Sequence, residues 1–375
     1  MILLSALLFV VQNPPASAPT AGQRDTAHIV IVATTDIHGR VLGWDYVKDM
    51  PAPGGLSRVA TALETLRARY PANLILVDAG DLLQGNPFAA YFGRYDKRQP
   101  HPIVDALNVL QYDVVTPGNH DFDFGVDFLR TAAKQATYRY VSANIEDSTG
   151  APFFPQTVVL ARGPVKVGIT GFTTPGVMLW DRTQLAGRAR VRRIGGAAGP
   201  ALPRLEGEGA DLKIALIHGG FGESTYDTTG IGPENEAAAL ASATPKPDLV
   251  IVGHTHREVR DTVINGVHFV QPKNWAQSLA VVHVSLGKEP GTDRWRVTRV
   301  HSDLQPLGAV AEQQRLARRV DAAHQAARQW AAAPVGIAGP GFDARYARAQ
   351  DTPLLHFINE GQGRKAGAQL SATAA

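Results

Sequence analysis

The sequence of 375 residues contains no cysteine. Disulfide bonds, zinc sites with thiolate ligands and a cysteine nucleophile are therefore excluded. Any metal ion must be held by histidine, aspartate, asparagine or carbonyl groups. The chain also carries little net charge, because 37 Lys and Arg residues against 34 Asp and Glu residues leave +3. So small an excess, without a run of basic residues, argues against a nucleic-acid polymer as partner. The arginines at 187–193 alternate with small residues and indicate a solvated edge or strand.

Long hydrophobic runs are also missing, except for one at residues 2–11. Such a run is too short to cross a bilayer as a helix, so no stable membrane span is predicted. It fits the apolar part of a secretory signal peptide, and residues 1–23 are predicted to be such a peptide or a disordered tail. Ala16-Ser17-Ala18 offers a cleavage site, although Pro19 follows it and no basic residue precedes the run. We expect a periplasmic or secreted bacterial protein; the alternative is a mis-assigned start codon.

The remaining chain alternates β-rich runs with helical patterns, which predicts an α/β layered fold. Strands are expected at 28–34, 74–77, 113–115, 138–143, 165–170, 212–217 and 249–252, and helices at 56–70, 101–110 and 126–135. A pair of strands is expected at 262–270 and 278–286. A long surface helix is expected at 309–332, followed by a segment rich in Gly and Pro at 333–342 and a new helix at 351–362.

Five short clusters of possible metal ligands each follow one of the expected strands. They are Asp36-Ile37-His38, Gly80-Asp81, Gly118-Asn119-His120-Asp121, His218-Gly219-Gly220 and Gly253-His254-Thr255-His256. In α/β sheets the carboxyl ends of the strands meet at one edge, where loops converge to form a site. The oxygen and nitrogen donors of these clusters match what two adjacent divalent ions require, and such a pair is suited to hydrolysing phosphate esters.

The oxygen donors suggest how the ions are held. Asp36 suits a hard cation, while His38, two residues later and therefore on the same face of an extended chain, suits a transition metal. Asp81 has two carboxylate oxygens and can bridge two ions, and Asn119 offers an amide oxygen. Taken singly, each residue has an ordinary alternative, such as a solvated loop side chain or, for Asp81, a helix cap.

The histidines suggest the remaining roles. His120 can donate a proton to a leaving group, and Asp123 can accept the other imidazole proton and fix the tautomer. The glycines after His218 permit the close approach of a ligand. His254 and His256 are two residues apart and can each face one ion. The alternative for His120 is a partly buried structural histidine.

Taken together, the segments TTDIHGR, DAGDLLQG, TPGNHDFDFG, LIHGG and VGHTH resemble the calcineurin-like metallophosphoesterases. Their spacing and the segment QPKNWAQSLAVVHV are similar to the 5′-nucleotidase branch of that family. WDYVKDMPAPGGLSRVAT is most similar to periplasmic 2′,3′-cyclic-nucleotide 2′-phosphodiesterase/3′-nucleotidases. The resemblance covers about residues 28–375. It implies a four-layer α/β/β/α sandwich at 24–308, a linker helix and hinge at 309–342, and the incomplete start of a C-terminal nucleotide-binding domain at 343–375.

The resemblance also implies a ligand set, position by position. Metal site 1 would be formed by Asp36, His38, Asp81 and His256, and metal site 2 by Asp81, Asn119, His218 and His254. Asp81 would bridge two divalent ions (Mn, Zn, Fe or Co), and His120 with Asp123 would form the catalytic dyad. The implied reaction is attack of a metal-activated hydroxide on a nucleotide or another small phosphoester.

Two positions leave the subfamily open. Nucleotidases of the family often have Glu where Asp121 stands, and cyclic phosphodiesterases tend to have Asn where Asp123 stands. Hydrolysis of 2′,3′-cyclic nucleotides and 3′-nucleotides is the predicted activity. The alternatives are a 5′-nucleotidase/UDP-sugar hydrolase, a thiosulfohydrolase-like or sugar-phosphate hydrolase of the same fold, and a non-catalytic metal-binding fragment. The pattern predicts no oligomeric state.

Overall fold

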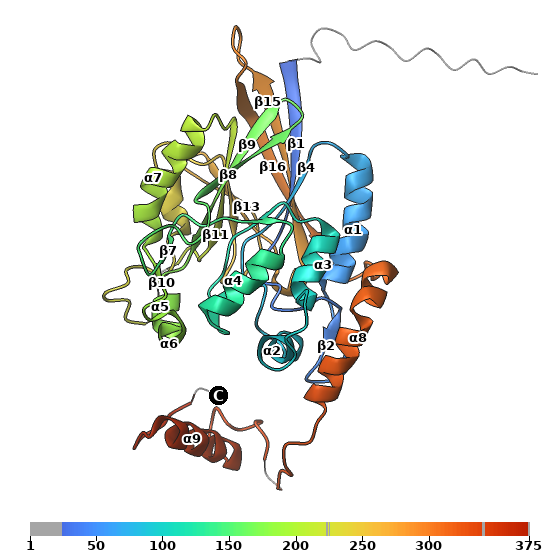
Figure 1. Ribbon diagram of the computed structural model, residues 1–375, viewed down its shortest axis with the longest axis vertical. Coiled ribbons are helices and arrows are strands. Elements are labelled where there is room, and N and C mark those ends of the chain that lie inside the picture. Colours follow the sequence, from blue (N-terminus) through green and yellow to red (C-terminus); the bar gives the residue numbers. More distant parts are fainter. Residues whose placement is uncertain (1–24, 223, 225, 340–341, 374–375) are drawn as a thin grey trace, which may run out of the picture. The chain divides into compact units, whose positions relative to one another are not determined.

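The computed structural model describes residues 25–222, 224, 226–339 and 342–373 (Figure 1). The predicted signal peptide or tail at 1–23 lies outside these residues. The chain divides after Ala331 into a large and a small compact unit. Among the described residues, no helix has both the length and the apolar character needed to cross a membrane. The domain boundaries expected from the sequence remain predictions.

The large unit contains a six-stranded sheet in the order β16-β15-β1-β4-β5-β6. Its strands are β1 (Thr26–Thr34), β4 (Leu74–Asp78), β5 (Val114–Val115), β6 (Arg139–Tyr140), β15 (Ser278–Lys288) and β16 (Trp295–Pro306). Strands β1, β4, β5 and β6 are parallel, whereas β15 runs antiparallel to both β1 and β16. The parallel strands therefore bring their carboxyl ends to one edge.

A second six-stranded sheet has the order β13-β14-β12-β11-β9-β8. Its strands are β8 (Thr157–Arg162), β9 (Val165–Thr173), β11 (Leu212–His218), β12 (Leu249–Val252), β13 (Val259–Ile264) and β14 (Val267–Gln271). Here β9, β11, β12 and β14 are parallel. Two short ribbons pair β2 (Trp44–Asp45) with β3 (Met50–Pro51) and β7 (Ile145–Asp147) with β10 (Ala189–Val191).

The expected pairing of 262–270 with 278–286 is wrong. The first segment is itself a hairpin of β13 and β14, whereas the second pairs with β1 in the other sheet. The physical reason is the turn: Asn265 has a φ of 49° and Gly266 a φ of 80°. Left-handed backbone at both central residues is what a tight two-residue hairpin needs, and Asn-Gly adopts it readily.

Alternation along the strands gives the unit four layers. Ile29 and Ile31 of β1 are buried between the two sheets, whereas Val30 and Val32 face helices on the outer side of the first sheet. Those helices are α1 (Leu56–Arg69), α2 (Pro87–Arg94), α3 (Pro102–Leu110), α4 (Val126–Gln135) and α8 (Gln314–Ala331). The second sheet is covered by α7 (Ile194–Gly207) and the 3-10 helix η3 (Ala237–Ser242) (Figure 1). The predicted α/β/β/α sandwich is thereby confirmed.

Short elements fill the ends of the sandwich. They are the helices α5 (Val177–Trp180) and α6 (Arg182–Leu185) and the 3-10 helices η2 (His120–Phe122) and η4 (Asn274–Ala276). The small unit contains α9 (Pro353–Ala366), which Thr352 caps at its start and Gly367 ends in a left-handed conformation. None of the residues of α9 is buried.

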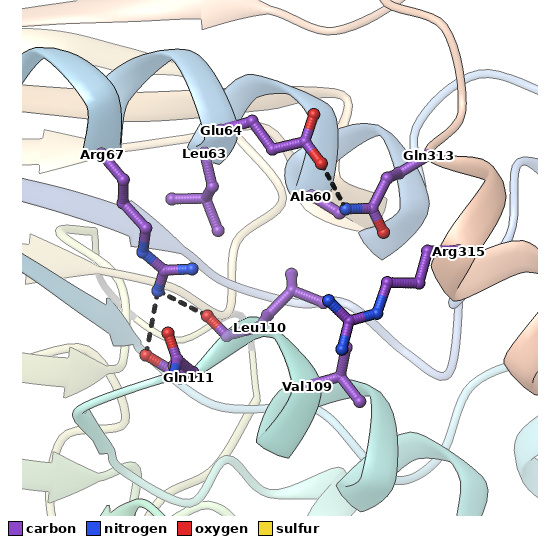
Figure 2. A pocket seen from close by; sticks show the side chains of 9 residues that line it. All are labelled: Ala60, Leu63, Glu64, Arg67, Val109, Leu110, Gln111, Gln313 and Arg315. Carbon is purple, nitrogen blue, oxygen red and sulfur yellow. Dashed lines mark hydrogen bonds between the residues drawn. The ribbon is translucent and has the colours of Figure 1, made fainter.

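A cavity of about 270 Å³ lies between α1, the end of α3 and the start of α8 (Figure 2). Arg67 extends across it and donates to the carbonyl of Leu110, and Glu64 accepts a hydrogen bond from Gln313 (2.6 Å). These groups join α1 to α3 and to the residue that precedes α8, and none of the predicted metal ligands lines the cavity. We therefore assign it to the packing of α8, which buries Leu316 in the same core.

His101 should make the stability of the large unit sensitive to acid. Its ring is 5% exposed and packs against the rings of Phe92 and Phe128, and neither ring nitrogen has a hydrogen-bond partner among the described residues. Burial lowers the pKa of His101 to about 4. Because the unfolded chain takes up a proton near pH 6.5 and the folded one does not, stability is complete above that pH and falls as the pH drops toward 4.

We expect His101 to lower the free energy of unfolding by about 2 kcal/mol when the pH falls from 7 to 5. In His101→Leu, the free energy of unfolding of the metal-free protein, measured with urea, should fall by about 2 kcal/mol less over this pH range. Equal pH dependence in variant and wild type would contradict the assignment.

Candidate metal centre

The predicted ligands lie at the carboxyl ends of parallel strands from both sheets. Asp36 follows β1, Asp81 follows β4, and the two loops are joined by hydrogen bonds from Asp36 N to Gly80 O and from His38 N to Asp81 O (both 2.8 Å). In the second sheet His218 ends β11, and Gly253 N donates to Ile217 O after β12 (2.9 Å). The loops of the two sheets meet where the backbone N of His254 donates to the carboxylate of Asp36 (3.1 Å). The predicted ligands therefore come together at this edge, as their position after the strands predicted.

One group of donors is formed by Asp36, His38 and His256, whose ligand atoms lie within 4.8 Å of one another. The Nε2 atoms of His38 and His256 are 2.9 Å apart, and Nε2 of His256 is 3.3 Å from Oδ1 of Asp36. Oδ2 of Asp81 lies 3.8 Å from Nε2 of His38. These are the four residues that the resemblance implies for metal site 1.

A second group is formed by Asp36, Asp81 and His218, all of them fully buried or nearly so. Nε2 of His218 lies 3.1 Å from Oδ2 of Asp81 and 3.2 Å from Oδ1 of Asn119. Three of the residues implied for metal site 2 therefore converge. The fourth, His254, lies beside His218 with the ring centroids 5.2 Å apart, but its Nε2 atom faces Glu234 instead.

The hydrogen bonds of these groups fit bound cations. Nδ1 of His38 lies 2.7 Å from the carbonyl of Gln84, and Nδ1 of His218 lies 2.8 Å from the carbonyl of Ala79. A carbonyl only accepts, so both Nδ1 atoms carry protons, and in the neutral rings both Nε2 atoms present lone pairs. Lone pairs facing a carboxylate such as Asp81 repel it unless a cation lies between them. The donor set of oxygen and imidazole without sulfur suits Mn, Zn, Fe or Co.

Electrostatics point the same way. Burial acts to lower the pKa of His218, but the negative charge of Asp81 and the hydrogen bond to it have the larger effect and raise this pKa to about 10. When no metal ion is bound, the protonated ring of His218 therefore supplies the positive charge. Burial acts to raise the pKa of Asp36, yet contacts with His256 and the charge of His218 hold it below its usual value. The site is therefore built to keep positive charge at its centre.

The backbone at the ligands is strained. A positive φ is found at Asp36 (51°), His38 (49°), Asp81 (61°), His254 (81°) and His256 (53°). Residues with side chains adopt this region at a cost, and such conformations cluster at functional sites. The loops also approach closely, since a Cβ on Gly118 would stand 2.1 Å from Oδ1 of Asp81. The chain holds these side chains inward at the expense of local stability.

The predicted dyad lies beside the second group of donors. Nδ1 of His120 is 3.1 Å from Oδ2 of Asp123, and its backbone N donates to Oδ1 of Asp81 (2.8 Å). The hydrogen bond to Asp123 raises the pKa of His120 to about 9 against the opposing effect of partial burial. His120 is therefore protonated near neutral pH, with its Nε2 proton free for another partner.

Asp121 has a structural role that its place in the sequence did not indicate. Its buried carboxylate accepts backbone N–H groups from Asp81, Leu82, Leu83 and Gly118 at 2.8–3.1 Å. Burial, with the charge of Asp81 adding to it, raises the pKa of Asp121 to about 6. The carboxylate thus joins the loop of Asp81 to the loop of Asn119. Only the fold brings these two loops together, so no local motif could reveal the contact.

Asp121→Asn should destabilise the large unit by about 3 kcal/mol, because the amide nitrogen would face two N–H donors that the carboxylate now satisfies. Urea unfolding of the metal-free protein at pH 8 measures the loss. Asp147→Asn is the matched control, because this carboxylate also accepts backbone N–H groups but is only partly buried. A loss in Asp121→Asn no larger than in the control would contradict the role.

Glu234 was also missed. Its Oε1 atom lies 2.6 Å from Nε2 of His254, and the hydrogen bond lowers the pKa of Glu234 although partial burial opposes it. The indole of Trp180 stacks on the face of the His254 ring, with centroids 5.7 Å apart and planes at 27°. Glu234 lies in the segment between His218 and β12, far from any of the motifs, which left the sequence without a signal for it.

Comparison with known proteins agrees with this geometry. The Calcineurin-like phosphoesterase family matches residues 29–258. This chain belongs to that family. The predicted family and enzyme class, a metal-dependent phosphoester hydrolase, are confirmed by this membership.

Several phosphoesterases are similar over most of the chain. It is 31% identical to the trifunctional nucleotide phosphoesterase protein YfkN of Bacillus subtilis, over 95% of this chain and 26% of that protein. It is also 31% identical to the 2′,3′-cyclic-nucleotide 2′-phosphodiesterase/3′-nucleotidase of Haemophilus influenzae, over 96% of this chain and 59% of that protein. A crystal structure of the calcineurin-like phosphoesterase YfkN matches with a TM-score of 0.74 at 32% identity, covering 82% of this chain and 99% of that one. The chain thus spans only part of the length of these curated relatives.

Proposed function

We propose that this phosphoesterase hydrolyses nucleotide esters with two divalent metal ions, acting on 2′,3′-cyclic nucleotides and on 3′-nucleotides. The observation that carries the proposal is the position of Asp81. Its Oδ2 atom is near Nε2 of His218 (3.1 Å) and Nε2 of His38 (3.8 Å), and each of these histidines belongs to a different one of the two groups of donors. An oxygen between two histidines with inward lone pairs is suited to bridge two ions. The names of similar phosphodiesterase/3′-nucleotidases support the substrate class.

In this proposal Asp36, His38, Asp81 and His256 hold one ion, and Asp81, Asn119, His218 and His254 hold the other. When bound, the two ions polarise the phosphate ester and activate a water molecule for attack on phosphorus. The carbonyls of Gln84 and Ala79 keep His38 and His218 in the tautomer that binds a metal.

The dyad supplies the proton. Protonated His120 holds its Nδ1 proton against Asp123, which leaves the Nε2 proton for the leaving sugar oxygen or for the negative charge on the phosphoryl oxygens. The partly exposed ring, whose side chain is 42% exposed, can reach a substrate that arrives from solvent. No covalent intermediate is needed.

The organisation of the whole protein is also a proposal. A catalytic domain at 24–308, a linker helix and hinge at 309–342, and the start of a nucleotide-binding domain at 343–375 would place base recognition in the C-terminal part. The predicted signal peptide would direct the protein to the periplasm or outside the cell, where it would serve nucleotide catabolism and phosphate salvage.

Substrate profiling tests the proposal. In Mn²⁺-supplemented buffer, the chain should hydrolyse bis-p-nitrophenyl phosphate, 2′,3′-cyclic AMP and 3′-AMP faster than 5′-AMP. Activity confined to 5′-AMP would favour the 5′-nucleotidase alternative, with which Asp123 is also compatible. Two bound ions without turnover of any of these esters would contradict nucleotide hydrolysis and favour a thiosulfohydrolase-like reaction.

A further inference from the structure

His254 is the one predicted ligand whose Nε2 atom turns away from the other donors. Oε1 of Glu234 lies 2.6 Å from that atom, and the side chains are only 13% and 10% exposed. The backbone N of His254 donates to both carboxylate oxygens of Asp36 (3.1 Å each), so the residue is nevertheless anchored at the centre of the site. If His254 binds a metal ion, the ligand atom must therefore be Nδ1.

We infer that Glu234 is a positioning residue for the second metal ion, because it accepts the Nε2 proton of His254 and so leaves Nδ1 as the ligand atom. The inference rests on the proposed two-metal function and adds to it a residue outside the family motifs. Carboxylates that accept the second imidazole proton fix the tautomer and orientation of metal-binding histidines and raise their basicity. For His38 and His218 backbone carbonyls do this; for His254 it is a charged side chain.

The surroundings hold Glu234 and His254 in place. The hydroxyl of Tyr226 also donates to the Glu234 side chain, and the backbone carbonyl of Glu234 accepts a hydrogen bond from the Thr174 hydroxyl (3.0 Å). Trp180 stacks on the histidine ring and approaches the ring of Tyr226, with centroids 5.9 Å apart. The imidazole is thus fixed by a hydrogen bond at its edge and by an aromatic ring on its face. A ring held this way loses little freedom when it binds an ion.

Three groups hold the ring nitrogens that face away from the ions, namely the carbonyls of Gln84 and Ala79 and the carboxylate of Glu234. The carboxylate makes the strongest electrostatic contribution of the three. A carboxylate makes the imidazole more basic than a carbonyl does, and it brings a further negative charge close to the ion. Removing it should weaken the ion held by His254 and leave the ion held by His38 and His256 almost unchanged. This selectivity separates a positioning role from general support of the fold, which would affect both ions.

The test is calorimetric titration of the metal-free chain with Mn²⁺. Wild type should bind two ions per chain. Glu234→Ala should bind the second ion about 10- to 100-fold more weakly and the first within about twofold. Glu234→Gln should lose less, because its amide oxygen can still accept the Nε2 proton.

Glu236→Gln is the matched control. Glu236 is as buried as Glu234, at 8% exposed, but its carboxylate accepts the N–H groups of Ile194 and Gly195 at the start of α7. This variant should become less stable and still bind both ions as wild type does.

The outcomes separate the two claims. Wild type that binds fewer than two ions would overturn the proposed function. Wild type that binds two, with Glu234→Ala binding both equally well, would overturn only the role of Glu234. If Glu234→Ala fails to fold, Glu234→Leu decides, because its side chain fills similar space but cannot accept the Nε2 proton. Equal weakening of both ions, or of neither, rejects the inference, and selective weakening of the second supports it.

Discussion

Asp81→Asn is expected to abolish tight binding of both metal ions and to lower hydrolysis by about 10³-fold or more, since the ions supply several kcal/mol of transition-state stabilisation. Oδ1 of Asp81 accepts the backbone N–H of His120 (2.8 Å), whereas Oδ2 faces the histidines of both donor groups. In the variant, the amide oxygen would stay with that N–H and the NH₂ group would point at the ions. The metal affinity of both sites should fall by more than the 10- to 100-fold that supporting residues contribute.

Metal content after dialysis and Mn²⁺ titration measure this effect. Asp78→Asn is the matched control, because Asp78 is equally buried three residues earlier but accepts hydrogen bonds from Thr34 (2.5 Å) and Gly80 N (2.7 Å). Burial raises the pKa of Asp78 well above its usual value, so the neutral amide replaces a carboxyl group whose negative charge is disfavoured. The control should keep both ions. Full occupancy of both ions in Asp81→Asn would remove Asp81 from the bridging position.

The sequence predicted that the metal-binding side chains lie close together, because this depends only on their position after the strands of the sheets. Asp36, Asp81 and His254 each follow a run of buried β-branched or apolar residues, and such runs end at one edge of an α/β sheet. Asp78, three residues before Asp81, is buried and supports the same loop by accepting the N–H of Gly80. What the sequence could not indicate is the atom each ligand uses, because that depends on carbonyls such as Gln84 O, which the fold brings to His38.

The roles of Glu234, Asp121 and Trp180 at the site were not predicted, because they depend on contacts between segments that are distant in the sequence. Glu234 reaches His254 across 20 residues, and Asp121 reaches the loop after β4 across about 40. Neither spacing is a local pattern, so composition and periodicity carry no trace of it. The same holds for Trp180, whose position over His254 requires α5 to lie beside the loop after β12.

Local propensity gives no signal for the helix α7, for which the sequence predicted no element. Its sequence, IGGAAGPALPRLEG, contains several glycines together with Pro200 and Pro203, which disfavour a helix interior. The helix nevertheless forms, because Ile194, Leu202 and Leu205 cover the outer face of the second sheet. Burial of these side chains, at roughly 25 cal/mol per Å², outweighs the weak propensity. Tertiary packing therefore decides this element.

His120→Ala should lower kcat by about 100-fold or more while both metal ions stay bound. Its ring is not among the two groups of donor atoms, and the backbone N–H that it gives to Asp81 is kept by alanine. Loss of the imidazole removes the proton donor for the leaving oxygen. His301→Ala is the matched control, because His301 forms a similar pair with Asp303 on β16 (3.2 Å) and both side chains are 47% exposed. An unchanged kcat in His120→Ala would exclude the residue from the mechanism.

Asp123→Asn tests the same dyad through pH. The hydrogen bond to Asp123 is the largest cause of the raised pKa of His120, so its loss should lower that pKa from about 9 toward the ordinary value. An acid catalyst is active below its pKa and inactive above it. The alkaline fall in kcat should therefore move to lower pH in Asp123→Asn, while Mn²⁺ affinity changes little. If kcat falls at the same pH in wild type and in Asp123→Asn, another group titrates there. If Asp123→Asn shifts the fall in wild type but causes no shift in the His120→Ala background, the shift belongs to the dyad.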